Sequence, residues 1–191
     1  MRIGIGYDAH RFNGKGPLRL GGITVPSARG LSGHSDADVL LHAVADALFG
    51  AIGAPDIGEQ FPSSDPRYRR ADSRTFVDAA IRQMRRKRFA VVNVDATVIA
   101  DAPRLIGYKT KMAHAISQML DVTPSQVSVK AKTTETFCPG KGGIAAQAVV
   151  LLKKRSWRVT RSRGPCCAEA KPRLRRGELR AQLRSPKGEY V

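Results

Sequence analysis

The sequence of 191 residues lacks any long hydrophobic run and contains only three cysteines. No stretch of about 18 consecutive apolar residues occurs, so we expect no membrane-spanning helix. Cys138, Cys166 and Cys167 do not form the spaced framework of a disulfide-stabilised protein. A strand pattern starts at Met1, so we also expect no secretory or transit peptide. These absences argue against a membrane-embedded or disulfide-rich secreted protein and predict a cytoplasmic one.

Acidic residues are scarce relative to basic ones, and the imbalance is concentrated near the C-terminal end. The formal net charge is +17, and residues 153–191 contribute 13 Lys and Arg against three Glu. Few large apolar side chains and scattered Pro and Gly in this stretch predict a disordered basic tail. Such a tail could bind nucleic acid or another polyanion. It lacks any motif known to contact bases in the grooves of DNA, and its basic residues are not interleaved with aromatic ones. We therefore expect no nucleic-acid partner and assign the tail no function.

Residues 1–152 have the alternating and helical apolar patterns of one folded domain. The expected strands cover residues 2–10, 18–25, 89–100, 126–133 and 144–153. The expected helices cover residues 36–52, 73–88 and 103–120, and the main expected loops cover residues 26–33 and 54–71. This order, without an internal repeat, predicts an α+β fold. We expect a mixed sheet of about four to five strands with helices packed on one face, in a ferredoxin-like arrangement.

The first expected strand ends in two potential metal ligands. Ile3, Ile5 and Tyr7 alternate with other residues, which predicts a strand with one buried face. Asp8 and His10 are two residues apart and therefore project from the same side of the strand. A carboxylate and an imidazole supply two thirds of a zinc-type site if a third ligand comes from elsewhere. The alternative is a polar strand end that faces water.

The first expected helix supplies a candidate third ligand. Asp38, His42 and Asp46 are spaced four apart and form one polar ridge on an otherwise apolar helix. The pattern indicates either a metal-ligating His42 supported by Asp38 and Asp46, or a core histidine with satisfied hydrogen bonds. In the first case, Asp8, His10 and His42 would hold a catalytic zinc with a fourth position open.

Other polar positions are weaker candidates. His34 and Ser35 precede this helix, where Ser35 opens a capping-box pattern, so the pair indicates either an anion site or a simple cap. Thr133 and Glu135 follow a strand and offer a hydroxyl donor and an oxygen ligand suited to Mg²⁺ or Mn²⁺. Lys141, in the Gly-rich loop that follows, could meet a phosphate.

These segments occur together, in order, in one known family. The segments that carry the resemblance are Arg2–Gly4, Gly6–His10, Gly21–Ile23, Gly30–Leu31, His34–Val39, His42, Asp56–Gly58, Phe61–Pro62, Asp65–Pro66, Ala71–Ser73, Asn93–Asp95, Ala102–Pro103, Lys130–Ala131 and Thr133–Glu135. Over residues 1–152 the chain closely resembles the 2-C-methyl-D-erythritol 2,4-cyclodiphosphate synthase family.

The resemblance implies a phosphorus–oxygen lyase of the non-mevalonate isoprenoid pathway. Members convert 4-diphosphocytidyl-2-C-methyl-D-erythritol 2-phosphate to the cyclic diphosphate and release CMP. They are homotrimers with active sites between subunits, and they use a zinc-type ion together with Mg²⁺ or Mn²⁺. Both reacting groups are anionic, so catalysis rests on positioning and charge neutralisation. Residues 1–152 would be the catalytic domain and residues 153–191 an extension.

The resemblance also implies roles for individual residues. Asp8, His10 and His42 would hold zinc, Glu135 would hold the second metal, and His34 and Thr133 would stabilise the transition state. The implied substrate contacts are Asp8, Ala9, His10, His34, Ser35, Asp56, Ile57, Gly58, Phe61, Pro62, Ser63, Ser64, Asp65, Ala100, Asp101, Ala102, Pro103, Arg104, Leu105, Ile106, Ala131, Lys132, Thr133, Thr134, Glu135 and Lys141. Among them, residues 100–106 and 131–134 of a neighbouring subunit would form the cytidine pocket.

Besides the extension at residues 153–191, the chain departs from the family pattern at two places. Ser63 stands where members usually carry an acidic residue. Residues 136–143 form a shortened loop with Lys141 as its only charge, so we do not expect it to bind an isoprenoid diphosphate as in relatives. Two alternative functions therefore stay open: a related metal-dependent phosphohydrolase, and a catalytically reduced phosphate-binding trimer with a scaffold or nucleic-acid role.

Overall fold

The computed structural model describes residues 1–135 and 142–155. Five strands form one sheet: β1 (Arg2–Lys15), β4 (Arg29–Leu31), β5 (Phe89–Ile99), β6 (Val127–Lys132) and β7 (Gly143–Lys154). Their order is β4-β1-β7-β5-β6, with β5 and β6 parallel and the other pairs antiparallel. A separate hairpin consists of β2 (Leu18–Leu20) and β3 (Ile23–Val25). The predicted α+β class with a mixed sheet is confirmed.

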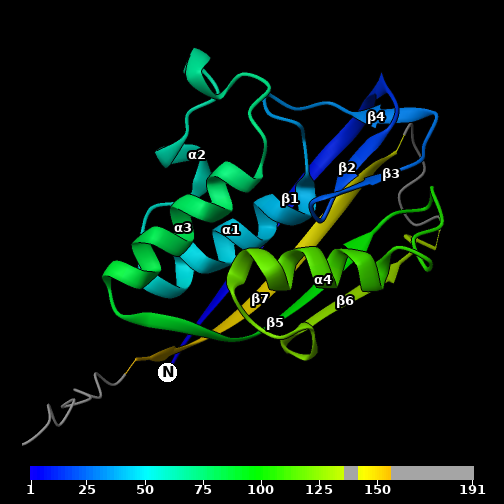
Figure 1. Ribbon diagram of the computed structural model, residues 1–191. Helices are drawn as coiled ribbons and strands as arrows, with labels where there is room; N and C mark the ends of the chain where they lie inside the picture. Colours follow the sequence, from blue (N-terminus) through cyan, green and yellow to red (C-terminus); the bar gives the residue numbers. More distant parts are fainter. Residues whose placement is uncertain (136–141, 156–191) are drawn as a thin grey trace, which may run out of the picture. The chain divides into compact units, whose positions relative to one another are not determined.

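The helices pack on one face of this sheet, as predicted (Figure 1). They are α1 (Val39–Ile52), α2 (Ile57–Gln60), α3 (Arg74–Arg86) and α4 (Lys109–Leu120), with 3₁₀ turns η1 (Pro66–Tyr68) and η2 (Pro124–Gln126). α1 is buried along nearly its whole length because it lies between the sheet and its neighbouring helices. No helix in the described part of the chain is long and apolar enough to cross a membrane.

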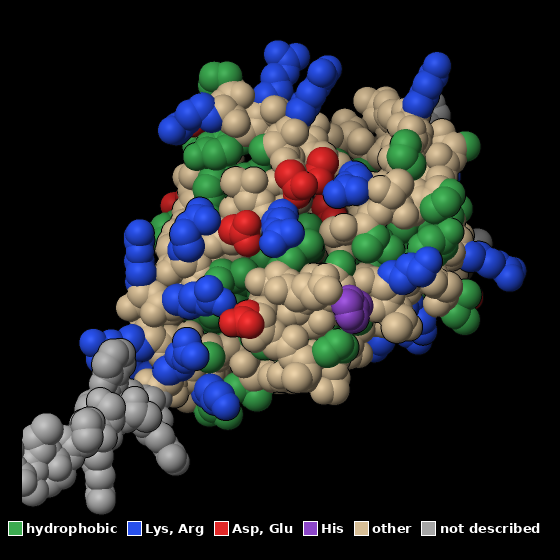
Figure 2. All heavy atoms as spheres, viewed as in Figure 1, with side chains coloured by type: hydrophobic (Ala, Val, Ile, Leu, Met, Phe, Trp, Pro, Cys, Tyr) green, Lys and Arg blue, Asp and Glu red, His purple; other side chains and the backbone are tan. Residues whose placement is uncertain are grey.

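The outer surface of the helical layer is basic. In α3 the apolar Phe76, Ala80 and Met84 are buried, whereas Arg82 and Arg85 on the other side are exposed. Figure 2 shows Lys and Arg side chains across this face of the molecule, with fewer acidic side chains between them. The basic character of the described domain is therefore a property of its surface. Residues 156–191 of the predicted basic tail, and Lys141, lie outside the described residues.

β1 has the predicted alternation, but the opposite face of the strand is buried. Ile3, Ile5 and Tyr7 are 71%, 62% and 61% exposed, whereas Gly4 and Gly6 are buried against α1. A Cβ atom at Gly4 or Gly6 would lie 2.0 or 2.1 Å from a carbonyl oxygen of α1. The predicted direction of the buried face is wrong, because glycines carry no hydrophobic signal yet permit a helix to pack closely.

Several element boundaries in the N-terminal half differ from the expected ones. Residues 18–25 form a hairpin that turns at Gly21 and Gly22, and β4 lies within the expected loop at residues 26–33. α1 begins at Val39 because the side chain of Asp38, not that of Ser35, caps it by accepting the backbone N–H group of Leu41 at 3.0 Å. Residues 54–71 contain α2 and η1, each opened by an aspartate cap.

α4 begins six residues later than the helix predicted at residues 103–120. Pro103 is typical of a first helical turn, but the segment around it is attached to the end of β6. Ala100 N–H donates to Lys132 O at 2.9 Å. The carboxylate of Asp101 accepts the backbone N–H and the hydroxyl of Thr134, at 2.8 and 2.7 Å. These contacts hold the segment in a loop, and the helix starts only beyond it.

Candidate metal centre

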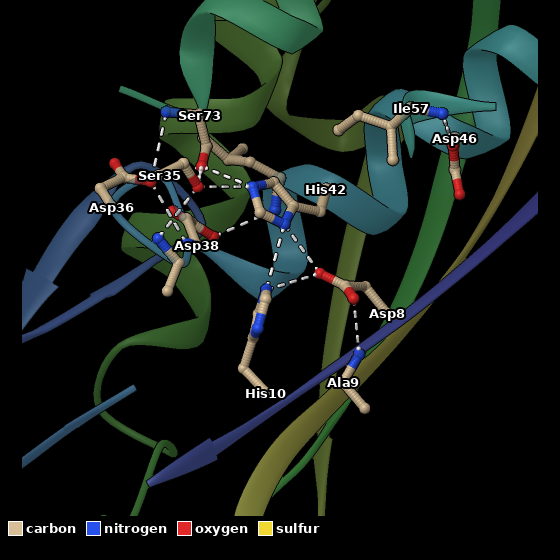
Figure 3. A network of polar contacts seen from close by, with 12 residues as sticks. Asp8, Ala9, His10, Ser35, Asp36, Asp38, His42, Asp46, Ile57 and Ser73 are labelled. Atoms are coloured by element: carbon tan, nitrogen blue, oxygen red, sulfur yellow. Dashed lines mark hydrogen bonds and ion pairs between the residues drawn. The ribbon is translucent and has the colours of Figure 1, made fainter. Parts of the chain in front are cut away.

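Asp8, His10 and His42 bring three potential ligand atoms together where β1 faces α1 (Figure 3). Asp8 Oδ2 lies 2.7 Å from His42 Nδ1 and 3.0 Å from His10 Nε2. The two imidazole nitrogens are 3.3 Å apart. Within residues 1–135 and 142–155 no other group of three His, Cys, Asp or Glu residues has this geometry.

The packing of β1 against α1 creates this cluster. Gly4, Gly6, Asp8 and His10 alternate along the strand and share the face that looks toward the helix. The two glycines allow the backbone of α1 to approach β1 closely. His42, which lies in the first turns of α1, thereby comes within hydrogen-bonding distance of Asp8. The same face of the strand provides both the close contact and the ligands.

The charges of the cluster stabilise one another. Burial alone would raise the pKa of Asp8, but hydrogen bonds and charges from His10 and His42 outweigh it and hold that pKa well below its ordinary value. The hydrogen bond to Asp8 raises the pKa of His10 above its ordinary 6.5, against the opposing effect of burial. Asp8 is therefore an ionised carboxylate that attracts cations.

These three residues fit a divalent metal ion. Zinc bonds of about 2.0–2.1 Å place tetrahedral ligand atoms about 3.3 Å apart. The three observed separations, between 2.7 and 3.3 Å, are at or slightly below this value. The side chains of Asp8 and His10 are 28% and 19% exposed, so the cluster is open on one side. Imidazole and carboxylate donors suit zinc, and an open side leaves room for a ligand from solution.

A cavity of about 300 Å³ adjoins the cluster. Its polar wall contains His34 and Ser35 together with the two histidines of the cluster. The cavity lining also includes the predicted substrate-contact residues Ile57, Gly58, Phe61 and Ser63. Asp56 does not line the cavity but caps α2, accepting Glu59 N–H at 2.9 Å. The structure therefore brings segments around residues 8, 34, 42 and 57 to one place.

Two aromatic residues of the cavity were missed by the sequence reasoning. Tyr68 and Phe76 pack with Phe61, with ring centroids 5.1 and 4.9 Å from it, and Phe76 also contacts the ring of His42. Phe76 lies on the buried side of α3. No sequence signal distinguished Tyr68 from an ordinary loop residue.

The second ring nitrogen of His42 faces two serine hydroxyls. Ser73 Oγ lies 2.9 Å and Ser35 Oγ 3.1 Å from His42 Nε2. Ser73 is completely buried, and its hydroxyl donates to Asp36. Ser73 is the N-cap residue of α3, yet its side chain makes no capping bond.

The carboxylates of Asp38 and Asp46 make no hydrogen bond to the ring of His42, in contrast to the predicted support; the contact with Asp38 is a backbone one, in which His42 N–H donates to Asp38 O at 3.0 Å. Asp38 accepts N–H groups from Gly21, Gly22 and Leu41 at 2.8, 2.7 and 3.0 Å, and burial raises its pKa. Asp46 accepts Ile57 N–H at 2.8 Å, and burial raises its pKa as well. The helical spacing is correct, but both carboxylates satisfy backbone donors, so they hold the β2–β3 turn and the start of α2 in place.

The other predicted substrate-contact residues do not line this cavity. Residues 100–106 and 131–135 lie together near the ends of β5 and β6, joined by the Asp101–Thr134 contacts. Thr133 donates its hydroxyl to Glu135, which is not grouped with other potential metal ligands in the described part of the chain. Ala9 is on the exposed face of β1. Pro62, Ser64 and Asp65 are neighbours in sequence of the cavity residues Phe61 and Ser63 but do not line the cavity themselves.

The fold and the site define a class: a single-domain α+β protein with an Asp–His–His group that could hold a divalent metal, beside a partly apolar cavity. Residues 1–153 match the model of the YgbB family, and the chain belongs to this family.

Named relatives agree with this assignment. The chain is 52% identical over 156 residues to 2-C-methyl-D-erythritol 2,4-cyclodiphosphate synthase from Geobacillus kaustophilus, a match that covers 81% of this chain and 99% of the relative. The bifunctional IspDF from Campylobacter jejuni superimposes with a TM-score of 0.77 and 37% identity over 82% of this chain but only 43% of its own. A CDP complex of IspF from Plasmodium falciparum superimposes with a TM-score of 0.70 and 33% identity, covering 81% and 97% of the two chains.

Proposed function

We propose that this protein converts 4-diphosphocytidyl-2-C-methyl-D-erythritol 2-phosphate to 2-C-methyl-D-erythritol 2,4-cyclodiphosphate and CMP, a step of isoprenoid biosynthesis. The observation that carries the proposal is the Asp8–His10–His42 cluster beside the cavity. The sequence identity to a named synthase over nearly that enzyme's whole length supports the same reaction.

Asp8, His10 and His42 are the proposed zinc ligands, and Glu135 is the proposed ligand of Mg²⁺ or Mn²⁺. Their donor types suit these ions, since imidazole and carboxylate favour zinc and carboxylate oxygen favours Mg²⁺. When bound, the ions supply positive charge that neutralises the phosphate oxygens during transfer. The protein's own contribution is to place the anionic groups in line, without a covalent intermediate.

The cavity walls have the properties that this substrate requires. His34 and Ser35 offer an imidazole and a hydroxyl beside the cluster and are proposed to contact phosphate, with His34 stabilising the transition state. Ile57, Gly58 and Phe61 provide a mostly apolar wall that would hold the methylerythritol carbons and keep water away. Asp56 fixes the start of this wall through its cap.

We further propose a homotrimer in which a neighbouring subunit completes each active site. Ile3, Ile5 and Tyr7 leave an apolar strip on the open face of the sheet, which a second copy of the chain would cover. Residues 100–106 and 131–134 do not line the cavity of their own chain, so they are available to a neighbour. The CDP complex of a relative supports a cytidine nucleotide as a ligand of this protein.

The proposed catalytic domain covers residues 1–152, and residues 153–191 are an extension to which we assign no role in catalysis. β7 continues two residues past this boundary, to Lys154. A cytoplasmic location stays a prediction from the sequence.

Product identification tests the proposed function. Purified protein is incubated with zinc, Mg²⁺ and the diphosphocytidyl methylerythritol 2-phosphate, and the products are separated and identified by mass. Cyclic diphosphate and CMP in equal amounts are expected. Linear hydrolysis products would replace the proposal with a phosphohydrolase, and no turnover by folded, zinc-loaded protein would replace it with a binding role.

A further inference from the structure

His42 is held from the side opposite to the candidate metal site. Its Nδ1 faces Asp8 Oδ2 at 2.7 Å, while its Nε2 points toward Ser73 Oγ at 2.9 Å (Figure 3). Ser73 precedes the first turn of α3 and is completely buried. Its hydroxyl continues to Asp36, so a chain of polar contacts runs from His42 through Ser73 to Asp36.

The number of available protons sets the direction of these hydrogen bonds. Asp36 Oδ1 accepts the backbone N–H groups of Ser73 and Asp38 at 3.2 and 3.3 Å, and the Ser73 hydroxyl also donates to it. A hydroxyl has a single proton. Because Ser73 gives that proton to Asp36, Ser73 Oγ can only accept a hydrogen bond from His42. His42 Nε2 therefore carries a proton.

We propose that Ser73 and Asp36 are positioning residues that hold the Nε2 proton of His42, so that a bound metal ion is coordinated through Nδ1, the nitrogen that faces Asp8. This inference rests on the metal site proposed above. A neutral imidazole protonated at Nε2 can coordinate only through Nδ1. The hydrogen bond also fixes the orientation of the ring, so that less rotational freedom is lost when the ion binds.

Asp36 is a suitable end for this chain of contacts. Its Oδ2 lies 4.0 Å from Arg19 Nε, so a cation lies close to the oxygen that Ser73 does not use. The carboxylate belongs to the loop before α1, whereas Ser73 begins α3, and Arg19 is on β2. The ring of His42 is therefore positioned relative to three other segments of the fold.

Ser35 is the competing partner for the same nitrogen. Its Oγ lies 3.1 Å from His42 Nε2 and also accepts Ala37 N–H at 3.2 Å. Ser35 lines the cavity and is only partly buried, whereas Ser73 is fully buried and is anchored by Asp36. The geometry thus favours Ser73 as the residue that holds the ring.

Zinc affinity of the full-length protein tests the proposal, measured by competition with a chromophoric chelator. Ser73→Ala should lower the affinity about 10- to 100-fold, as is typical when the outer hydrogen bond of a metal-bound histidine is removed. Asp36→Asn should cause a smaller loss because an amide oxygen is a weaker acceptor. Ser73→Thr retains the hydroxyl and should recover most of the affinity.

The matched control is Ser117→Ala, which removes a buried hydroxyl on α4 that donates to the backbone oxygen of His114. This variant should leave zinc affinity unchanged. Thermal denaturation of the metal-free variants separates a loss of affinity from a loss of folding. If Ser73→Ala does not fold, the zinc affinities of Asp36→Asn and Ser73→Thr test the proposal instead: the first should be lower than that of the wild type, and the second close to it.

A second readout reports on the tautomer directly. In the zinc-loaded protein, nitrogen-15 NMR of the histidine rings should show His42 coordinated through Nδ1, with a slowly exchanging Nε2–H proton. In Ser73→Ala that proton should exchange faster with water. Unchanged affinity and unchanged exchange in Ser73→Ala, or a loss confined to Ser35→Ala, would overturn the proposal. Absence of zinc binding by the wild-type protein would instead overturn the metal site itself.

Discussion

The side chain of Asp8 is held in one orientation by its two oxygens. Oδ1 accepts the N–H group of Ala9 at 2.8 Å, and Oδ2 faces both His10 and His42. The carboxylate cannot turn without losing one of these sets of contacts. It therefore directs one oxygen at the point where the two imidazoles meet, which is the arrangement that a metal ion requires from a monodentate ligand.

His42→Ala should abolish both zinc binding and turnover, because only two of the three proposed ligands would remain. The loss of affinity should exceed the about 10- to 100-fold effect typical of an outer partner. Zinc content after dialysis and the rate of CMP release measure the two effects. The control is His114→Ala, which removes an exposed histidine of α4. Full activity of the His42 variant would show that the proposed ligand set is wrong.

The contact between β1 and α1 is the packing feature that places the candidate metal centre. Helices usually pack on sheets through side chains, but here the strand presents two glycines to the helix backbone. The ligands Asp8 and His10 extend from the same strand face a few residues further along. A change in the separation of these two elements would therefore change the distances within the metal site.

Gly6→Ala should destabilise the protein by about 1–3 kcal/mol or more, the usual cost of overpacking. The new Cβ atom would lie 2.1 Å from a backbone oxygen and 2.6 Å from a backbone nitrogen of α1, neither of which can move independently of the helix. Urea denaturation measures the free energy of unfolding. Gly107→Ala is the control, since a Cβ atom there meets nothing within 4 Å. Equal stability of the two variants would contradict the packing argument.

The contact between residue 101 and residue 134 can be tested through a pKa. The backbone N–H and the hydroxyl of Thr134 hold the pKa of Asp101 below its ordinary 3.8. Thr134→Val removes the hydroxyl and should raise that pKa toward 3.8, without reaching it because the N–H donor remains. Carbon-13 NMR titration of the carboxyl groups measures the change. The pKa of Asp65, which hydrogen bonds from Arg67 lower, should stay constant and serves as the internal control.

The sign of the accompanying stability effect follows from linkage. A carboxyl group whose pKa is lower in the folded protein stabilises the fold at pH values above its unfolded pKa. That contribution disappears as the pH falls through the lower, folded pKa. The melting temperatures of wild type and Thr134→Val should therefore converge in strongly acidic solution. A difference that grows with acidity would contradict the assignment.

At the scale of the whole molecule, the two faces of the sheet differ. Helices cover one face, whereas Ile3, Ile5 and Tyr7 of β1 are exposed on the other. These side chains are adjacent on the strand and form one apolar strip. A second copy of the chain that covers this strip would also contact β1, the strand that carries Asp8 and His10 on its other face.

Ile5→Lys should weaken self-association, because a charge would be placed in the proposed subunit interface. Sedimentation equilibrium of the wild-type protein should give three times the chain mass, and the variant should give smaller species. Gln118→Lys adds the same charge on the exposed side of α4 and should not change the mass. A wild-type monomer, or a variant that remains trimeric, would contradict the proposed interface.

The order of the elements predicted the fold class, and spacing along a strand and a helix made Asp8, His10 and His42 candidate ligands. Spacing alone left a water-facing strand end and a core histidine open, and the family resemblance favoured the cluster that the structure brings together. The sequence did not reveal which face of β1 is buried, since glycines have no hydrophobic signal. Ser73 and Asp36 were also beyond its reach. They are 37 residues apart, and each had a local explanation near the start of a helix.

The glycines of β1 have a consequence for mutational tolerance. Side chains added at Gly4 and Gly6 would meet the backbone oxygens of Ala47 and Ala43, atoms that every amino acid retains. No second substitution on α1 can remove an atom that belongs to the backbone. In a saturation scan, these two strand positions should therefore reject all other residues and yield no suppressors on the facing helix, whereas mutations at buried side-chain contacts can be compensated by their neighbours.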